Sequence, residues 1–168
     1  MINAHTHLYG SLALGMPAPK HASANFVEHL EQVWWKLDRG LDKESTRASF
    51  EAGLLDCLQN GTTTVIDHHA SPNYVNGSLD LLAEIAESFG INISICFETS
   101  DRNGSASFMD ELTENLRAMR KFESNPYVAP LLGLHASFTL SDDSLKVISE
   151  LMEEFPDCGI HIHVAEDM

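Results

Sequence analysis

The sequence has few positive charges and few cysteines. Its 168 residues include 25 Asp and Glu but only 10 Lys and Arg, which gives a formal charge of −15. Such a chain repels phosphate backbones and anionic lipid, so nucleic-acid and membrane-surface partners are not expected. The three cysteines stand apart without a CxxC pair, which argues against a disulfide framework or a cysteine-rich zinc site and favours buried thiols.

Long apolar runs and a basic leader are also missing. No apolar stretch reaches the roughly 18 residues of a membrane span. The first residues carry His in place of the basic region of a signal peptide. We therefore expect a cytoplasmic protein. The 43% hydrophobic content supports one buried core, and no linker or repeat divides the chain, so we expect a single domain over residues 1–168.

Helical and extended patterns alternate along the chain. Apolar spacing of 3.6 residues and capping residues such as Asp42 predict helices over residues 25–37, 43–59, 78–89, 107–122 and 141–155. Short β-branched or apolar stretches predict strands over residues 1–4, 62–67, 91–97, 127–134 and 159–164. Strands separated by helices build a parallel sheet through right-handed crossovers.

Polar, titratable residues follow every predicted strand. They are His5 and His7, Asp67 to His69, Glu98, His135, and His163 with Glu166. In a (β/α)8 barrel, the carboxyl ends of the strands carry the active site, and a complete barrel takes roughly 250 residues. The pattern therefore predicts an α/β fold, a partial TIM (β/α)8-type barrel with strands one to five. A doubly wound sheet is the alternative, but no glycine-rich phosphate loop follows the first strand.

Two histidine motifs indicate metal chemistry. His5-Thr6-His7 lies at the end of the first strand, and His163 and Glu166 form an HxxE motif at the end of the last. Residues i and i+2 of a strand point to the same face, so His5 and His7 aim two imidazoles at one point, as a divalent metal requires. His161 shares a face with His163, so spacing alone does not choose between them.

With these motifs the sequence resembles the amidohydrolase superfamily. Within it, the chain looks like the branch of aromatic-base deaminases and chlorohydrolases, and most narrowly like the SsnA-type aminohydrolases. Four stretches carry the resemblance, at residues 2–7, 60–69, 133–141 and 161–167. The resemblance covers essentially the whole chain, and the combination of HxH on the first strand with HxxE on the fifth is specific.

The resemblance implies a hydrolase that uses metal-activated water on non-peptide C–N bonds. The reaction would be deamination of an aromatic or cyclic amine or amidine, or a related chlorohydrolysis. His5, His7 and His163 would bind the metal, and Glu166 would carry the proton. The HxxE match selects His163 over His161, which is then a packed or supporting residue. We expect one divalent ion, zinc first and iron second, because residues 127–135 contain no lysine to bridge two ions.

Substrate contacts are expected from His135, His69 and Trp34. By resemblance, His135 would contact the substrate or its developing oxyanion, which makes it a second catalytic residue. His69 represents the polar group after the second strand, and Trp34 would cover the entrance while Trp35 packs in the core. Residues at the end of the third strand, Glu98 among them, are weaker candidates.

The family also uses a His on its sixth strand and an Asp on its eighth, and neither region occurs in this sequence. We therefore expect a fragment with little activity of its own that acts, when complete, on a small molecule. The alternative is a non-catalytic metal-binding half-barrel that dimerises or docks to a partner, because a partial barrel exposes strand edges and apolar faces. A phosphate-sugar barrel enzyme is disfavoured by the acidic charge.

Overall fold

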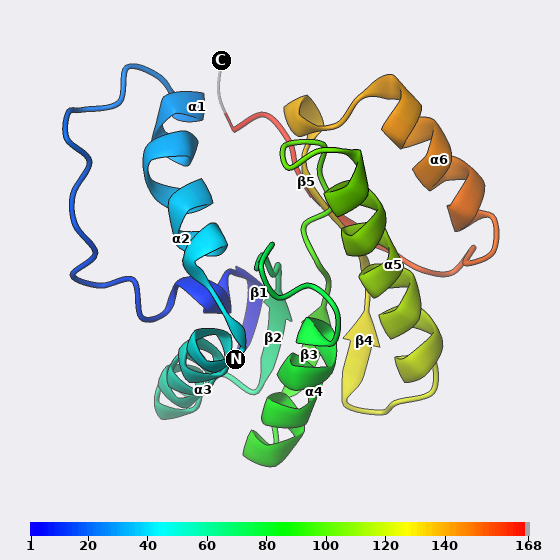
Figure 1. Ribbon diagram of the computed structural model, residues 1–168. Coiled ribbons are helices and arrows are strands. Elements are labelled where there is room, and N and C mark those ends of the chain that lie inside the picture. The colour runs from blue at the N-terminus through cyan, green and yellow to red at the C-terminus, as the bar shows by residue number, and fades with distance from the viewer. Residues whose placement is uncertain (167–168) are drawn as a thin grey trace.

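The computed structural model describes residues 1–166, and Asp167 of the last matched stretch lies outside them (Figure 1). The described strands are β1 (Ile2–Thr6), β2 (Thr64–Asp67), β3 (Asn92–Ile95), β4 (Val128–Pro130), β5 (Leu132–Ala136) and β6 (Ile160–His163). Strands β1 to β4 pair in sequence order, all parallel, and β5 pairs with β6, also parallel. A bridge between Thr99 and Leu134 joins the two ladders.

The helices lie outside the strands, as Figure 1 shows. They are α3 (Lys43–Gln59), α4 (Ser78–Phe89), α5 (Ser105–Phe122) and α6 (Asp142–Met152). The predicted cap of α3 is confirmed, because the Asp42 side chain accepts a hydrogen bond from the backbone N–H of Ser45. Gly90 ends α4 with a φ of 68°, a left-handed conformation that glycine adopts without steric cost.

Strand periodicity separates the core from the concave face of the sheet. On β3 and just beyond it, Ile93, Ile95 and Phe97 pack in the main hydrophobic cluster with residues of α3 and α4. The alternate residues Cys96 and Glu98 point to the opposite side, where the histidines lie. A smaller cluster places Leu132 and Leu134 of β5 against α5 and α6. Apolar packing therefore fixes which side chains reach the concave face.

Two predicted elements differ from the structure. The strand expected over residues 127–134 divides into β4 and β5, and His135 lies within β5. Pro130 has no N–H to donate, and the regular ladder with β3 ends at it; after it the chain also pairs with β6, while Leu134 keeps a bridge to Thr99 beyond β3. The helix expected over residues 25–37 divides into α1 (Phe26–His29), a π-helical turn (Leu30–Trp34) and α2 (Trp35–Gly40).

No helix among the described residues combines the length and the apolar character that a bilayer crossing requires. Two 3-10 turns, Leu8–Gly10 after β1 and Ser137–Thr139 after β5, lead the chain away from the strand ends. The segment from α1 to α2 stands beside these strand ends (Figure 1). The candidate site lies between the strand ends and this segment.

Candidate metal centre and cavity

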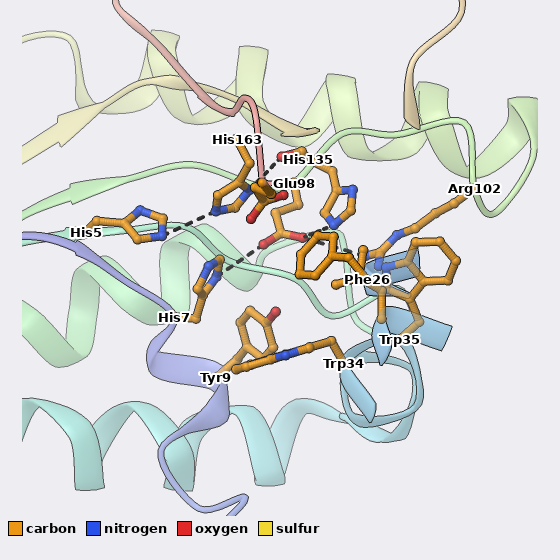
Figure 2. Close-up of a pocket in the computed structure, with 12 residues that line it drawn as sticks. His5, His7, Tyr9, Phe26, Trp34, Trp35, Glu98, Arg102, His135 and His163 are labelled. Carbon is orange, nitrogen blue, oxygen red and sulfur yellow. Dashed lines mark hydrogen bonds and ion pairs between the residues drawn. The ribbon is translucent and has the colours of Figure 1, made fainter. Parts of the chain in front are cut away.

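A cavity opens at the carboxyl ends of the strands (Figure 2). Polar residues from the strand ends form one side and aromatic and apolar residues from the N-terminal third form the other. The lining residues are His5, His7, Glu98, Arg102, His135, His163 and Glu166 on the polar side, and Tyr9, Phe26, Leu30, Trp34 and Trp35 on the apolar side. The sequence motifs from the first and last strands therefore meet in one place.

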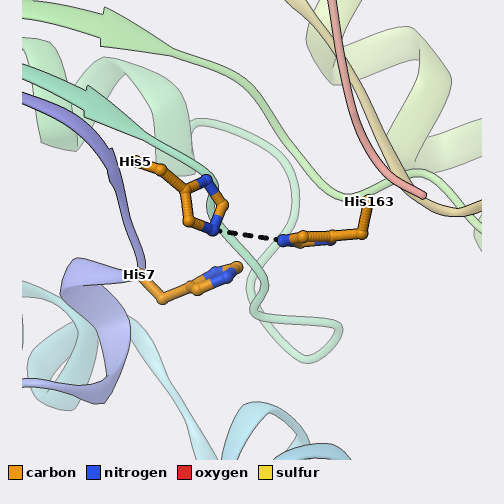
Figure 3. A group of neighbouring side chains, drawn as sticks. All are labelled: His5, His7 and His163. Atoms are coloured by element: carbon orange, nitrogen blue, oxygen red, sulfur yellow. Dashed lines mark hydrogen bonds between the residues drawn. The ribbon is translucent and has the colours of Figure 1, made fainter. Parts of the chain in front are cut away.

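His5, His7 and His163 converge, as Figure 3 shows, and we call them the outer site. One ring nitrogen from each lies within 4.8 Å of the others. The Nε2 atoms of His5 and His163 are 3.3 Å apart. Two nitrogens bound to one tetrahedral zinc at 2.0–2.1 Å are separated by about 3.3 Å, so this spacing fits a shared ion.

Hydrogen bonds decide which nitrogen of each outer imidazole is free. Nδ1 of His7 lies 2.7 Å from the backbone oxygen of His68, and Nδ1 of His163 lies 2.6 Å from that of His135. A carbonyl only accepts, so Nδ1 carries the proton and Nε2 keeps its lone pair. Metal-binding histidines are held in this way. Nδ1 of His5 pairs instead with Nε2 of His161, at 2.9 Å.

Glu98 is a fully buried carboxylate beneath the outer site. Its oxygens lie 3.2 Å from His7 Nδ1, 3.3 Å from His68 Nδ1, 3.7 Å from Arg102 and 3.8 Å from His135 Nε2. Burial raises the pKa of Glu98, but close polar contacts and charge interactions with His68 and His7 outweigh it and hold the pKa well below its usual range. Glu98 is therefore an anion at neutral pH. Its alternation with Cys96 just beyond β3 is the sequence signal that could have identified it as a site residue.

The two histidines after β2 point in opposite directions. His68 reaches the histidine cluster, with its ring centroid 4.6 Å from that of His163. His69 is buried between Phe50 and Phe97, and its Nε2 lies 2.8 Å from the Ser71 hydroxyl. Burial lowers the pKa of His69 to about 3, so it is neutral. His69 does not line the cavity, so the structure does not place it at the substrate. Its neighbour His68 faces the histidine cluster instead, because successive residues of an extended chain face opposite sides.

Both tryptophans line the cavity, although Trp35 was expected in the core. The π-helical turn ends at Trp34 and rotates the two indoles relative to an uninterrupted helix. A buried ion pair holds this segment, because Arg102 contacts Asp38 of α2 at 2.7 Å. The Arg102 guanidinium also lies over the Trp35 ring, 5.5 Å from its centroid. The aromatic wall is thus attached to the loop that follows β3.

His135 and Glu166 lie at the cavity, one buried and the other exposed. His135 Nδ1 pairs with the Thr139 hydroxyl at 2.9 Å, which leaves Nε2 for the cavity. Burial lowers the pKa of His135 to about 4. Ala165 has a φ of 60°, a conformation rare for residues with a side chain, and this turn brings Glu166 back to the cavity after β6.

The arrangement matches proteins of known fold. Guanine deaminase of E. coli superposes with a TM-score of 0.76 at 20% identity, over 99% of this chain and 37% of that one. An adenosine deaminase from Xanthomonas campestris with bound zinc gives the same TM-score and identity, over 99% and 36%. The predicted α/β class and partial barrel are confirmed by these likenesses and by the parallel strands.

Sequence comparison agrees with the fold. A 5'-deoxyadenosine deaminase of Methanopyrus kandleri is 30% identical over 171 residues, which cover 99% of this chain. The chain spans about 36% of the length of that relative. The model of the amidohydrolase family matches residues 1–168, from one end of the chain to the other. The chain therefore belongs to the amidohydrolase family.

Proposed function

We propose that the protein containing this chain is a metal-dependent hydrolase of non-peptide C–N bonds. The reaction removes an amino group from an aromatic or cyclic amine or amidine, and related chlorohydrolysis uses the same site. The observation that carries this proposal is the outer site, where backbone carbonyls hold two of three converging imidazoles with Nε2 free. In this proposal residues 1–168 are the first part of one barrel domain.

His5, His7 and His163 are the residues that would hold the metal, one divalent ion with zinc preferred and iron second. Three neutral nitrogen donors suit either ion. When bound, such an ion acts as a Lewis acid that polarises the reacting carbon and makes water more acidic. Backbone carbonyls of this chain fix the tautomers of His7 and His163. The Nδ1–H of each ring donates to a carbonyl, which keeps both rings oriented.

Glu166 is the residue we propose as proton carrier. Its carboxylate lies at the cavity and is exposed, so it can take a proton from water and hold it for the departing nitrogen. His135 is the proposed second catalytic residue, and its Nε2 would contact the substrate from the neighbouring strand β5. Glu98 remains anionic beneath both groups and favours positive charge that develops above it.

The shape of the cavity supports a planar substrate. Trp34, Trp35 and Phe26 supply flat aromatic faces opposite the histidines, and such faces stack on planar rings (Figure 2). Relatives and structural neighbours are named for the deamination of 5'-deoxyadenosine, guanine and adenosine. We therefore propose an aminated purine or similar heterocycle as the substrate class.

The test begins with the intact mass of the protein in its native source. A mass above 18.6 kDa identifies a longer product, which is then assayed for ammonia release from 5'-deoxyadenosine, adenosine and guanine after zinc loading. We expect activity that Glu166→Gln removes while zinc content stays unchanged. An active Glu166→Gln variant would contradict the proton-carrier role. A native mass of 18.6 kDa with no ammonia release would sink the hydrolase proposal in favour of a metal-binding half-barrel.

A further inference from the structure

A second group of potential metal ligands lies behind the outer site. His68 of the β2 end, Cys96 after β3 and His161 of β6 each place one ligand atom within 4.8 Å of the others. We call these three residues the inner group. None of them has a role in the proposed hydrolysis. The ring centroids of His68 and His161 are 4.4 Å apart, with the rings 30° from parallel.

His68 points to a missing ligand. Its side chain is fully buried, and neither ring nitrogen has a hydrogen-bond partner among the described residues. Nδ1 faces the Glu98 carboxylate at 3.3 Å, and Nε2 has no hydrogen-bond partner among the described residues. Buried polar atoms are nearly always satisfied, because an unpaired one costs about 1–3 kcal/mol. A bound cation would satisfy this nitrogen.

Cys96 supplies a sulfur at the distance that a shared ion requires. Its Sγ is 3.8 Å from His161 Nδ1. Zinc binds sulfur at about 2.3 Å and nitrogen at about 2.0–2.1 Å, so two such ligands on a tetrahedral ion are separated by about 3.6 Å. Cys96 is fully buried, and its sulfur also contacts the carbonyl oxygen of Asp67, at 3.5 Å.

We propose that His68, Cys96 and His161 form a second metal position, an inner site for a zinc-like divalent ion bound through one thiolate and two imidazoles. Sulfur and imidazole together favour zinc over magnesium, calcium or manganese. Binding replaces the thiol proton of Cys96 by the metal and releases that proton to water. This inference goes beyond the proposed function and shares with it only the contact between His5 and His161.

That contact makes the two positions alternatives. One proton lies between His5 Nδ1 and His161 Nε2, which are 2.9 Å apart. When His5 holds an ion through Nε2, its Nδ1 donates this proton and His161 keeps the other proton on Nδ1. When His161 holds an ion through Nδ1, its Nε2 donates and His5 carries a proton on Nε2. While this hydrogen bond is intact, an ion occupies either the outer or the inner position. The shared proton is bound to His5 when the outer position is occupied and to His161 when the inner position is occupied.

Cobalt reports the inner site without any assay of catalysis. The purified chain is titrated with Co²⁺ in place of zinc, and sulfur-to-cobalt charge-transfer absorption in the near ultraviolet shows whether a thiolate binds. We expect this band in the unmodified chain and in the double variant Cys57→Ser/Cys158→Ser, which leaves Cys96 as the single thiol. We expect its loss in Cys96→Ser. Absence of the band from the unmodified chain would overturn the proposal.

Further variants keep the test decisive if Cys96→Ser does not fold. His68→Gln should also lose the band, and a band that persists there would overturn the ligand set. His7→Ala removes an outer ligand only, so its band should persist or strengthen, which separates this inference from the hydrolase proposal. Equilibrium dialysis should find one cobalt per chain at saturation. Two ions bound together with the thiolate band present would overturn the exclusion between the sites.

Discussion

The outer site and the inner group are built from similar side chains but are held in different ways. In the outer site, main-chain oxygens accept the Nδ1 protons of His7 and His163. In the inner group, neither nitrogen of His68 has a hydrogen-bond partner within residues 1–166, and His161 pairs with another imidazole. Main-chain carbonyls can therefore set the tautomer of an imidazole whatever side chains surround it. An imidazole that pairs with other side chains shares its proton with them.

Exposure separates the two groups as well. His5 is exposed and the outer site opens to the cavity, whereas His68 and Cys96 are completely buried. An ion in the outer position can therefore exchange with solvent directly. An ion in the inner position exchanges only when the strand ends move apart, so we expect chelators to remove it more slowly.

The largest expected effect comes from removal of an outer ligand. In a Cys96→Ser background, which leaves only the outer site, His163→Ala should weaken zinc binding by more than about a hundredfold, beyond the effect of losing a supporting residue. Competition with a chromophoric chelator measures this. His29→Ala is the matched control, because His29 is exposed on α1 and does not line the cavity. Equal zinc affinity in the two variants would show that His163 is not a ligand.

Metal addition should stabilise the fold through the same site. Zinc at about 100 times its dissociation constant should add about 2.7 kcal/mol to the free energy of unfolding of the Cys96→Ser chain. Chelation should reverse the gain, and thermal unfolding with and without chelator measures it. The gain should disappear when His163→Ala is added. A chain that zinc does not stabilise would mean that the three imidazoles bind no ion in the folded state.

A substitution beneath the inner group should disturb the inner group and leave the outer site unchanged. A Cβ atom on Gly133 would lie within 3 Å of the Phe97 backbone and of Cys96 Cβ. Gly133→Ala should therefore lower the free energy of unfolding by about 2 kcal/mol and displace the Cys96 sulfur. Urea unfolding measures the loss. Gly40→Ala, where a Cβ meets nothing within 4 Å, is the control, and an equal effect there would refute the packing argument.

The smallest effect is expected from His68→Gln at the outer site. The oxygen that accepts the His7 proton belongs to the main chain of residue 68, so this substitution leaves it in place. In the Cys96→Ser background, zinc affinity should change by no more than about twofold, well below the tenfold or greater loss typical of a lost supporting contact. The same chelator competition gives the value. A tenfold loss would mean that the His68 side chain supports the outer site.

The sequence predicted the elements whose signals are local. The helix beginning after Asp42, the helix ending at Gly90 and the alternation that builds a parallel sheet all follow from neighbouring residues. Local signals failed at Pro130, where the regular ladder with β3 ends, and at Leu30–Trp34, where a π-helical turn interrupts the helix. Both depend on what the segment packs against, which periodicity does not contain.

The residues of the candidate site also divide into those that local patterns predict and those that they do not. The HxH and HxxE motifs could be found because strand geometry places alternate residues on one face. The sequence did not separate His68 from His69, and it ranked Glu98 low. That separation depends on which residue at each strand end packs into the hydrophobic core. At the end of β2 it is His69, which lies between Phe50 and Phe97.

The residue types that gather at the strand ends follow from the sequence alone, since the alternation of strands and helices brings those ends to one face. Which nitrogen of each imidazole is free depends instead on contacts that form only in the folded chain. The oxygen that orients His7 lies 61 residues away along the chain, and the one that orients His163 lies 28 residues away. Tautomers depend on such partners, and no local pattern of residues specifies them.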